Sequence, residues 1–267
     1  MDYVTALGDD AFSERMLAAW RAEGVGTDRV VRRAGRLPGL YIIEVDAGGE
    51  RRFHYWRDSA PARELFALPQ TPAILEALPR YEYLYLSGVS LSLYGEAGRA
   101  RLFEALDAAR RRGCRVVFDT NYRPRSWPDI GVARAAITAV TRRVDIVLTG
   151  FDDERPLFGD SDAFATARRL RGAGIGEVVV KQGSSGCVVA VGYSEIVVPA
   201  EPGTAVVDTT AAGDSFNAAY LAARIARAEP SDAARAGHRL AAAVIGHPGA
   251  IIPRAAMPGD LLRIPTA

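Results

Sequence analysis

The stretch VVDTTAAGDSFNAAYLAARIAR, residues 206–227, changes character at its middle. Its β-branched start predicts a strand, and the apolar residues from Phe216 to Ala223 recur at the spacing of a buried helix face. Three small residues, Ala211, Ala212 and Gly213, and an acid, Asp214, lie at the junction. A helix start exposes unpaired N–H groups with partial positive charge, and small side chains leave them open to an anion. The stretch predicts either an anion site beside Asp214 or an ordinary acid at a helix start.

Composition and charge narrow the class of protein. The chain has 267 residues with 33 basic and 32 acidic side chains, a net charge of +1, so nothing favours a nucleic-acid or anionic membrane surface. Cys114 and Cys187 lack metal-ligand spacing and are expected to be buried free thiols. We find no secretory leader and no apolar run of transmembrane length, and we expect a cytoplasmic protein.

Apolar runs alternate with amphipathic stretches along the chain. Residues 3–8 predict a strand and residues 9–23 a helix, whose apolar residues Phe12, Met16, Ala19 and Trp20 share a face. Residues 39–58 predict an antiparallel hairpin around a Gly-Gly turn, which we interpret as a small β-flap. From residue 81 onward, strands and helices alternate regularly and end on a helix at about residues 232–245. This pattern predicts one α/β domain over residues 1–267, with a mostly parallel sheet covered on both faces.

Such a sheet binds ligands beyond the carboxyl ends of its strands, where Asp214 is expected. A carboxylate there can accept a hydroxyl proton while bare N–H groups stabilise a transferring phosphoryl group. The sequence contains no Walker-type loop, no G-x-G-x-x-G after a strand, no zinc motif and no G-x-S-x-G elbow.

The segment DTTAAGDSF, residues 208–216, resembles the second signature of the ribokinase-like (PfkB) sugar kinases. Together with GAIIPRAAMP (249–258), FDTNYRPRSW (118–127) and VTALGDDAFSERMLAAW (4–20), it is similar to the branch that phosphorylates 2-dehydro-3-deoxygluconate (KDG). The similarity runs over essentially the whole chain. It implies a ribokinase-like three-layer sandwich with a mostly parallel central sheet and a β-flap, and ATP-dependent phosphorylation of KDG to its 6-phosphate.

The resemblance also implies roles for single residues. Asp214 would be the catalytic base, and Ala211, Ala212 and Gly213 would form the anion hole. Tyr55 and Arg57 of the flap, and Arg123 beyond it, would contact the sugar acid. Two arginines suit a substrate that carries a carboxylate, because arginine can grip one bidentately. Taken without the resemblance, Arg57 and Arg123 are more readily interpreted as solvated surface residues.

The cofactors implied are ATP and Mg²⁺. The nucleotide would be held by residues of the KQGSSG segment and the anion hole: Lys181, Gly183, Ser184, Gly186 and Gly213. The same segment could also be a plain hairpin turn. Asp153 or Glu154 would organise Mg²⁺ through water, or both could simply be acids at a helix start. The three histidines, His54, His238 and His247, are interpreted as structural.

The family pattern has a further strand and a G-G-x-x-x-N segment before the strand at residues 3–8. We therefore expect Met1 to be a mis-assigned start or the chain to be a fragment, with an unpaired strand edge and an exposed apolar helix face. A kinase for another sugar, such as fructose or ribose, and a non-catalytic remnant that binds nucleotide or a partner are the alternatives. The resemblance also implies a homodimer formed through the flap.

Overall fold

The computed structural model describes residues 1–45, 51–203 and 205–259. Contacts divide the chain into two compact units, Met1–Leu84 with Ser90–Cys114, and Tyr85–Val89 with Arg115–Ala267. The strand β5 (Tyr83–Ser87) and the helix α3 (Gly88–Leu93) contribute residues to both units. That the whole chain acts as one domain stays a prediction.

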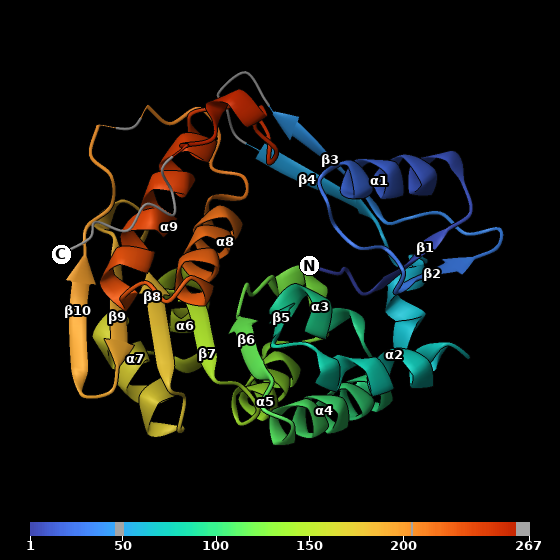
Figure 1. Ribbon diagram of the computed structural model, residues 1–267, viewed down its shortest axis with the longest axis horizontal. Coiled ribbons are helices and arrows are strands. Elements are labelled where there is room, and N and C mark those ends of the chain that lie inside the picture. Colours follow the sequence, from blue (N-terminus) through green and yellow to red (C-terminus); the bar gives the residue numbers. More distant parts are fainter. Residues whose placement is uncertain (46–50, 204, 260–267) are drawn as a thin grey trace. The chain divides into compact units, whose positions relative to one another are not determined.

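The first unit begins with a β-α-β element (Figure 1). Strand β1 (Thr5–Gly8) pairs in parallel with β2 (Val30–Arg33), and α1 (Ala11–Ala22) connects them. Asp10 caps α1, since its Oδ1 accepts from the backbone N–H of Phe12 at 2.8 Å. The strand and the helix predicted at the start of the chain are both confirmed.

The apolar residues that share one face of α1 are not the residues that the helix buries. Phe12 is 60% exposed, and the residues that the helix buries are Ser13 and Leu17. The hydroxyl of Ser13 donates to Asp10 Oδ2 at 2.6 Å, which lets a polar residue lie inside. The packed face is therefore one position away from the apolar stripe that the spacing indicated.

The flap is an antiparallel pair of β3 (Leu40–Val45) and β4 (Arg51–Trp56), with Leu40 opposite Trp56 and Tyr41 opposite Tyr55. The hairpin predicted over residues 39–58 is confirmed, while its Gly-Gly turn lies outside the described residues. Helical segments complete the unit: Pro61–Ala67, α2 (Thr71–Ala77), Leu78–Arg80 and α4 (Glu96–Arg111).

The second unit is built on a six-stranded sheet in the order β10-β9-β8-β7-β6-β5 (Figure 1). Its strands after β5 are β6 (Arg115–Asp119), β7 (Ile146–Gly150), β8 (Glu177–Lys181), β9 (Cys187–Val191) and β10 (Ser194–Val198). Strands β6, β7 and β8 run parallel, and β9 and β10 add an antiparallel edge. The sheet is mostly parallel with a mixed edge, as predicted.

Helices cover both faces of this sheet. They are α5 (Ile130–Thr141), α6 (Phe151–Phe158), α7 (Ala163–Gly172), α8 (Ala212–Ile225) and α9 (Pro230–Ile245). Helix α7 packs on β8 and β9 from behind in Figure 1, whereas α9 contacts β9 and β10 from the front and packs along α8. A strand that is covered on both faces has a continuous run of apolar residues. Three such runs are fully buried: Val116–Phe118, Ile146–Leu148 and Val178–Val180.

An ion pair attaches helix α8 to the first residue of strand β8. Glu177 Oε1 accepts from Tyr220 Oη at 2.7 Å and from Arg224 Nε at 2.9 Å, and its Oε2 accepts from Arg224 Nη2 at 2.9 Å. Burial by itself raises the pKa of Glu177, but these donors more than offset it and hold the pKa below its usual range. Glu177 is therefore a charged group inside the layer between sheet and helix.

The strand predicted at the start of residues 206–227 is absent. Val206 and Val207 are exposed and lie outside any strand. The backbone N–H groups of Val207 and Asp208 both donate to the carbonyl of Ile245, at the end of α9. The chain thus approaches α8 as a loop fastened to a helix end, because those two donors bond to that helix and not to a neighbouring strand.

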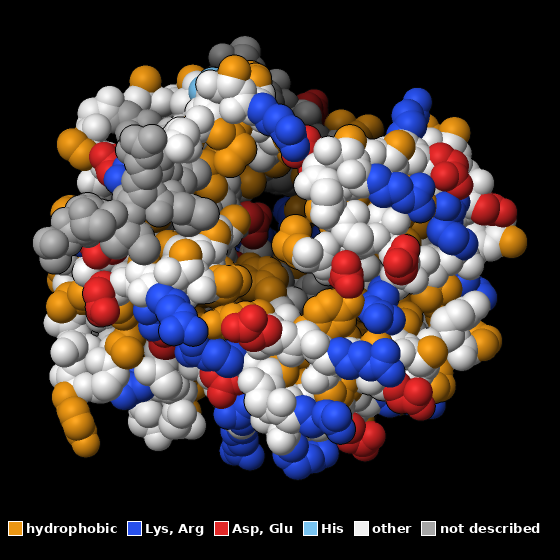
Figure 2. Space-filling model, viewed as in Figure 1, with side chains coloured by type: hydrophobic (Ala, Val, Ile, Leu, Met, Phe, Trp, Pro, Cys, Tyr) orange, Lys and Arg blue, Asp and Glu red, His pale blue; other side chains and the backbone are white. Residues whose placement is uncertain are grey.

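The visible surface carries both signs of charge, with arginine, aspartate and glutamate interspersed (Figure 2). No large field of one sign covers that face. Among the described residues, no helix is both long enough and apolar enough to cross a membrane.

Candidate active site

The first turn of α8 carries the residues that the sequence placed at the site. Ala211 is the N-cap residue and has φ of 61°, a left-handed conformation that is uncommon for a residue with a Cβ atom. No side chain caps this helix, and Gly213 and Asp214 are exposed. The strained backbone turns the chain sharply into α8 and leaves its positive end open, as an anion site requires.

The loop before this turn is held by Asp208. Its Oδ1 accepts from the N–H of Thr210 at 2.8 Å and from the hydroxyl of Thr210 at 2.7 Å. Its Oδ2 accepts from the N–H of Gly249 at 2.9 Å. One carboxylate therefore joins DTTAAGDSF to GAIIPRAAMP, two segments that the sequence singled out and that are far apart along the chain.

A buried polar cluster lies against the next turn of α8. Asn217 Oδ1 accepts from Lys181 Nζ at 2.8 Å, and Asn217 Nδ2 donates to Asp119 Oδ2 at 2.8 Å and to Tyr85 Oη at 3.2 Å. Lys181 Nζ also forms an ion pair with Asp119 at 3.8 Å. The carboxyl ends of β6 and β8 are thus joined to α8 through one asparagine.

Acidic groups gather around this cluster. Burial raises the pKa of Asp119, with Lys181 opposing the rise and the negative charge of Asp214 adding to it. Burial also raises the pKa of Asp153, to about 6, with Arg123 opposing the rise and Asp119 adding to it. Arg123 Nη1 lies 3.3 Å from Asp153 Oδ1 and donates to the carbonyl of Tyr122 at 2.8 Å.

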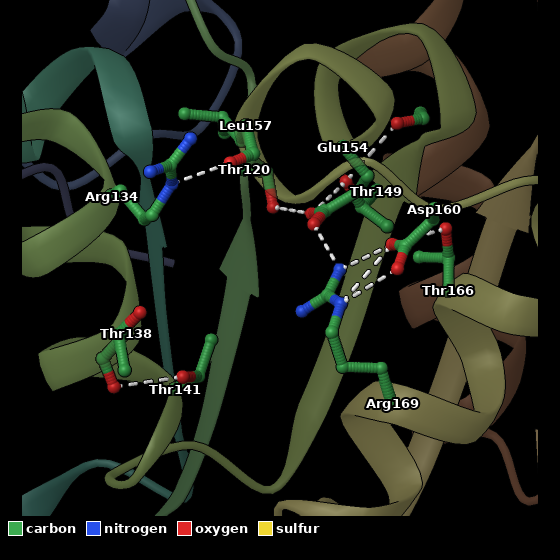
Figure 3. A network of polar contacts seen from close by, with 11 residues as sticks. Thr120, Arg134, Thr138, Thr141, Thr149, Glu154, Leu157, Asp160, Thr166 and Arg169 are labelled. Carbon is green, nitrogen blue, oxygen red and sulfur yellow. Dashed lines mark hydrogen bonds and ion pairs between the residues drawn. The ribbon is translucent and has the colours of Figure 1, made fainter. Parts of the chain in front are cut away.

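Glu154, the next residue after Asp153, lies within a network of hydrogen bonds and ion pairs (Figure 3). It is fully buried; its Oε1 accepts from the hydroxyls of Thr120 and Thr149, and its Oε2 accepts from Arg169 Nη2 at 2.7 Å. Arg169 is held in turn by Asp160. This network fastens α6 and α7 to the ends of β6 and β7 and engages both carboxylate oxygens, so Asp153 is the acid left closer to solvent.

The KQGSSG segment forms the turn between β8 and β9. Gly183 and Gly186 have φ of 55° and 88°, and the backbone N–H of Gln182 donates to the carbonyl of Gly186. A Cβ atom on Gly186 would lie 2.2 Å from the carbonyl oxygen of Val198, so this glycine is required by the packing of β10. Gly183 and Ser184 are exposed at the tip, and their contact with a nucleotide stays a prediction.

The flap residues belong to the first unit. The guanidinium carbon of Arg57 lies 4.4 Å from the ring centre of Tyr55, and that ring lies 6.1 Å from the ring of Tyr41. Tyr55 and Arg57 are thus stacked on one another on the flap. Their contact with the sugar acid stays a prediction.

Sequence reasoning missed Asp119, Asn217 and Tyr85. Asp119 ends a buried strand, and the carboxyl ends of parallel strands meet at one edge, so its position was a usable signal. Asn217 follows Asp214 by three residues and shares its side of the helix. Tyr85 carried no such signal. No group of three or more metal-ligating side chains occurs in the described parts of the chain.

Comparison with known proteins agrees with this arrangement of fold and site. The model of the pfkB family of carbohydrate kinases matches residues 1–257. The chain belongs to the pfkB family of carbohydrate kinases, which are sugar kinases.

Named relatives and solved structures extend the comparison. The 2-dehydro-3-deoxygluconokinase of Dickeya dadantii is 47% identical over 259 residues, 96% of this chain and 84% of the relative. Its counterpart in Escherichia coli K12 is 45% identical over the same shares. The PfkB protein of a Polaromonas species matches with a TM-score of 0.81 at 25% identity, covering 92% of this chain and 79% of that one. The 2-dehydro-3-deoxygluconokinase of Thermotoga maritima, at 21% identity and a TM-score of 0.76 over 94% and 81% of the two chains, shares the fold.

Proposed function

We propose that this protein transfers the γ-phosphoryl group of ATP to the terminal hydroxyl of KDG and forms the 6-phosphate. The observation that carries the proposal is Asp214, an exposed carboxylate in the uncapped first turn of α8. Relatives named for this reaction, at 45–47% identity over 96% of the chain, support the choice of sugar.

The chemistry follows from the position of Asp214. Its carboxylate accepts the hydroxyl proton as the sugar oxygen forms a bond to the γ-phosphorus. The bond between that phosphorus and the bridging oxygen breaks, and ADP leaves with the electron pair. Backbone N–H groups of residues 211–213 stabilise the charge on the transferring group, because the start of a helix attracts anions.

Mg²⁺ and ATP complete the reaction. Asp153 fits the role of an acid that organises Mg²⁺ through water. It is partly exposed, and because burial raises its pKa, a nearby cation would stabilise its charged form. Glu154 fits less well because both of its carboxylate oxygens already accept hydrogen bonds from protein. The ion, when bound, offsets negative charge on the phosphates. Gly183 and Ser184, exposed at the tip of the β8–β9 turn, offer backbone to the nucleotide, whereas both backbone groups of the buried Gly186 already bond within the turn.

Sugar selection rests on arginine. Arg57, on which Tyr55 stacks, and Arg123 would each contact the carboxylate of KDG, whereas a neutral sugar needs no such contact. Arg123 now pairs with Asp153 at 3.3 Å, and we propose that it exchanges this partner for the substrate.

A coupled assay of ADP formation with KDG, fructose and ribose tests the function. We expect KDG to give a kcat/KM at least about 100-fold above the neutral sugars, equivalent to about 2.7 kcal/mol. Equal or better turnover of fructose or ribose would establish the kinase for another sugar. Nucleotide binding without turnover of any of the three would establish the non-catalytic alternative.

We further propose that the two units act together as one kinase domain, as a family model spanning residues 1–257 supports. The flap would pair with the flap of a second copy. Ile42 and Trp56 are exposed on one side of it and Tyr41 and Tyr55 on the other, and a hairpin of two strands with apolar groups on both sides is marginal alone.

Light scattering tests the dimer. The substitution Ile42→Lys places a charge on the flap, and we expect it to shift the protein from dimer to monomer. The matched control is Ile196→Lys on β10, which makes the same change on an exposed strand outside the flap. A monomeric wild-type protein, or a dimer that Ile42→Lys leaves intact, would contradict the proposal.

A further inference from the structure

Lys181 is the only lysine in a chain that otherwise uses arginine for its basic residues. Its side chain is 15% exposed, and its ammonium group is held by Asn217 at 2.8 Å and by Asp119 at 3.8 Å. The ring centre of Phe216 lies 6.0 Å away. The group is therefore fixed between the end of β8 and the side of α8.

The ammonium group lies close to the anion hole. A Cβ atom built on Gly213 would be 3.5 Å from Lys181 Nζ, so the positive charge lies against the first turn of α8. A side chain at position 213 would crowd this charge as well as the anion. Lysine suits the position because its charge is compact and its stem is flexible.

The buried carboxylate of Asp119 gives the positive charge of Lys181 a role. Its carboxylate is 3% exposed and lies among groups that interact electrostatically with Asp214, so its negative charge opposes a phosphoryl group arriving at α8. Asp119 also accepts from the backbone N–H of Asn121 at 3.2 Å, which holds the turn after β6. The ion pair with Lys181 lets Asp119 hold this turn while its negative charge is neutralised, so that it no longer repels the phosphoryl group.

We propose that Lys181 is a positioning residue that neutralises Asp119 and orients Asn217 beneath the anion hole, and that it is not a contact to the nucleotide phosphates. Its charge acts on the phosphoryl group only while that group is being transferred. The inference rests on the proposed function, since it concerns the step that Asp214 catalyses.

The first test separates catalysis from nucleotide binding. In Lys181→Met we expect kcat with the preferred sugar to fall about 100-fold, the size of effect seen when one preorganised electrostatic group is removed. We expect the Kd for ADP, measured by calorimetry, to stay within about twofold. A Kd raised tenfold or more, or an unchanged kcat, would overturn the proposal.

The matched control is Arg224→Met. Arg224 also joins α8 to a buried carboxylate of β8, is 18% exposed, and lies at the end of that strand away from Asp214. The Arg224→Met substitution should destabilise the protein without lowering the kcat of the folded fraction. Equal losses of kcat in the two variants would mean that Lys181 acts through stability alone.

A double variant tests the pairing and remains informative if Lys181→Met folds poorly. In Asp119→Asn the NH₂ group of the new amide must face a donor, either Asn217 Nδ2 or the backbone N–H of Asn121, because Lys181 fixes the orientation of Asn217. In Asp119→Asn combined with Lys181→Met, Asn217 can turn over and accept. We expect the double variant to recover kcat at least tenfold over either single variant, whereas additive losses would overturn the proposal.

The wild-type protein distinguishes the two levels of failure. If it phosphorylates none of the sugars, the proposed function fails and this inference with it. If it is active and the variants behave otherwise than expected, the inference alone fails.

Discussion

At the scale of the residue, the site depends on the surroundings of a few carboxylates. Asp214 is exposed at the start of α8, Asp119 is buried beside Lys181, and Glu154 is fully bonded inside the protein. The same functional group, a carboxylate, therefore has three environments, which suit proton transfer, neutralised support and structure respectively.

Asp153 gives a prediction at this scale. Its folded-state pKa of about 6 lies above the ordinary value of 3.8 for an aspartate, so between these values the folded protein holds more protons than the unfolded chain. The contribution of Asp153 to stability therefore falls as pH rises through this window and is constant above it. Without Mg²⁺, Asp153→Asn should exceed the wild type in stability by at most about 3 kcal/mol above pH 6, and the gain should vanish towards pH 4.

Urea unfolding at several pH values in EDTA measures this difference. Asp152→Asn is the matched control, because it removes the same charge from an exposed neighbour in the same helix. A gain from Asp153→Asn that does not depend on pH, or one that grows as pH falls, would contradict the assignment.

At the scale of the element, α8 is held by three kinds of contact. The Glu177–Arg224 pair fixes it near the start of β8, Asn217 fixes it at the other end, and α9 packs along it. The apolar face of α8 was predictable from spacing, and Phe216, Ala219, Tyr220 and Ala223 are indeed buried. Helix and sheet thus hold Asp214 on a rigid support.

Gly237 marks the closest approach of α9 to α8. A Cβ atom there would lie 2.7 Å from the ring of Phe216, which is confined by Tyr220 and His238. We expect Gly237→Ala to lower the free energy of unfolding by about 1–3 kcal/mol, measured with urea. Gly172→Ala is the control, since nothing lies within 4 Å of its Cβ position and alanine favours a helix. Equal or opposite effects would contradict this packing.

The sequence predicted elements better than it predicted their surroundings. The alternation of apolar runs located the strands from β6 to β10, because residues buried on both faces leave an unbroken pattern. It failed at Val206 and Val207, whose β-branched side chains suit a strand although their N–H groups bond to the end of α9. At α1 the apolar spacing did not mark the buried side, because Ser13, whose hydroxyl donates to Asp10, is buried and Phe12 is exposed.

The candidate site divides in the same way. Asp214 and the small residues before it were predictable, because an uncapped helix start leaves a local signature. The cluster of Asp119, Lys181 and Asn217 joins three elements spread over nearly 100 residues of chain, and no local spacing encodes such a contact. Lys181 was predictable as a site residue, but its contact with Asn217 and Asp119 needed the tertiary structure to be found.

At the scale of the whole molecule, the chain forms two compact units, the first of which includes the flap. The second unit holds Asp214, the cluster beneath it and the β8–β9 turn, which together meet the needs of phosphoryl transfer. The flap in the first unit carries Tyr55 and Arg57, which we propose for the sugar acid. We therefore propose that the second unit carries the chemistry and that the flap of the first unit contributes to substrate selection.

The most direct test of the central claim is the kcat of Asp214→Asn with KDG and ATP. Loss of the base should lower kcat about 100- to 10,000-fold while the Kd for ADP stays nearly unchanged. The control Asp232→Asn alters an equivalent acid in the first turn of α9 and should keep full activity. An Asp214→Asn protein with kcat within about threefold of the wild type would contradict the role of Asp214 as the catalytic base.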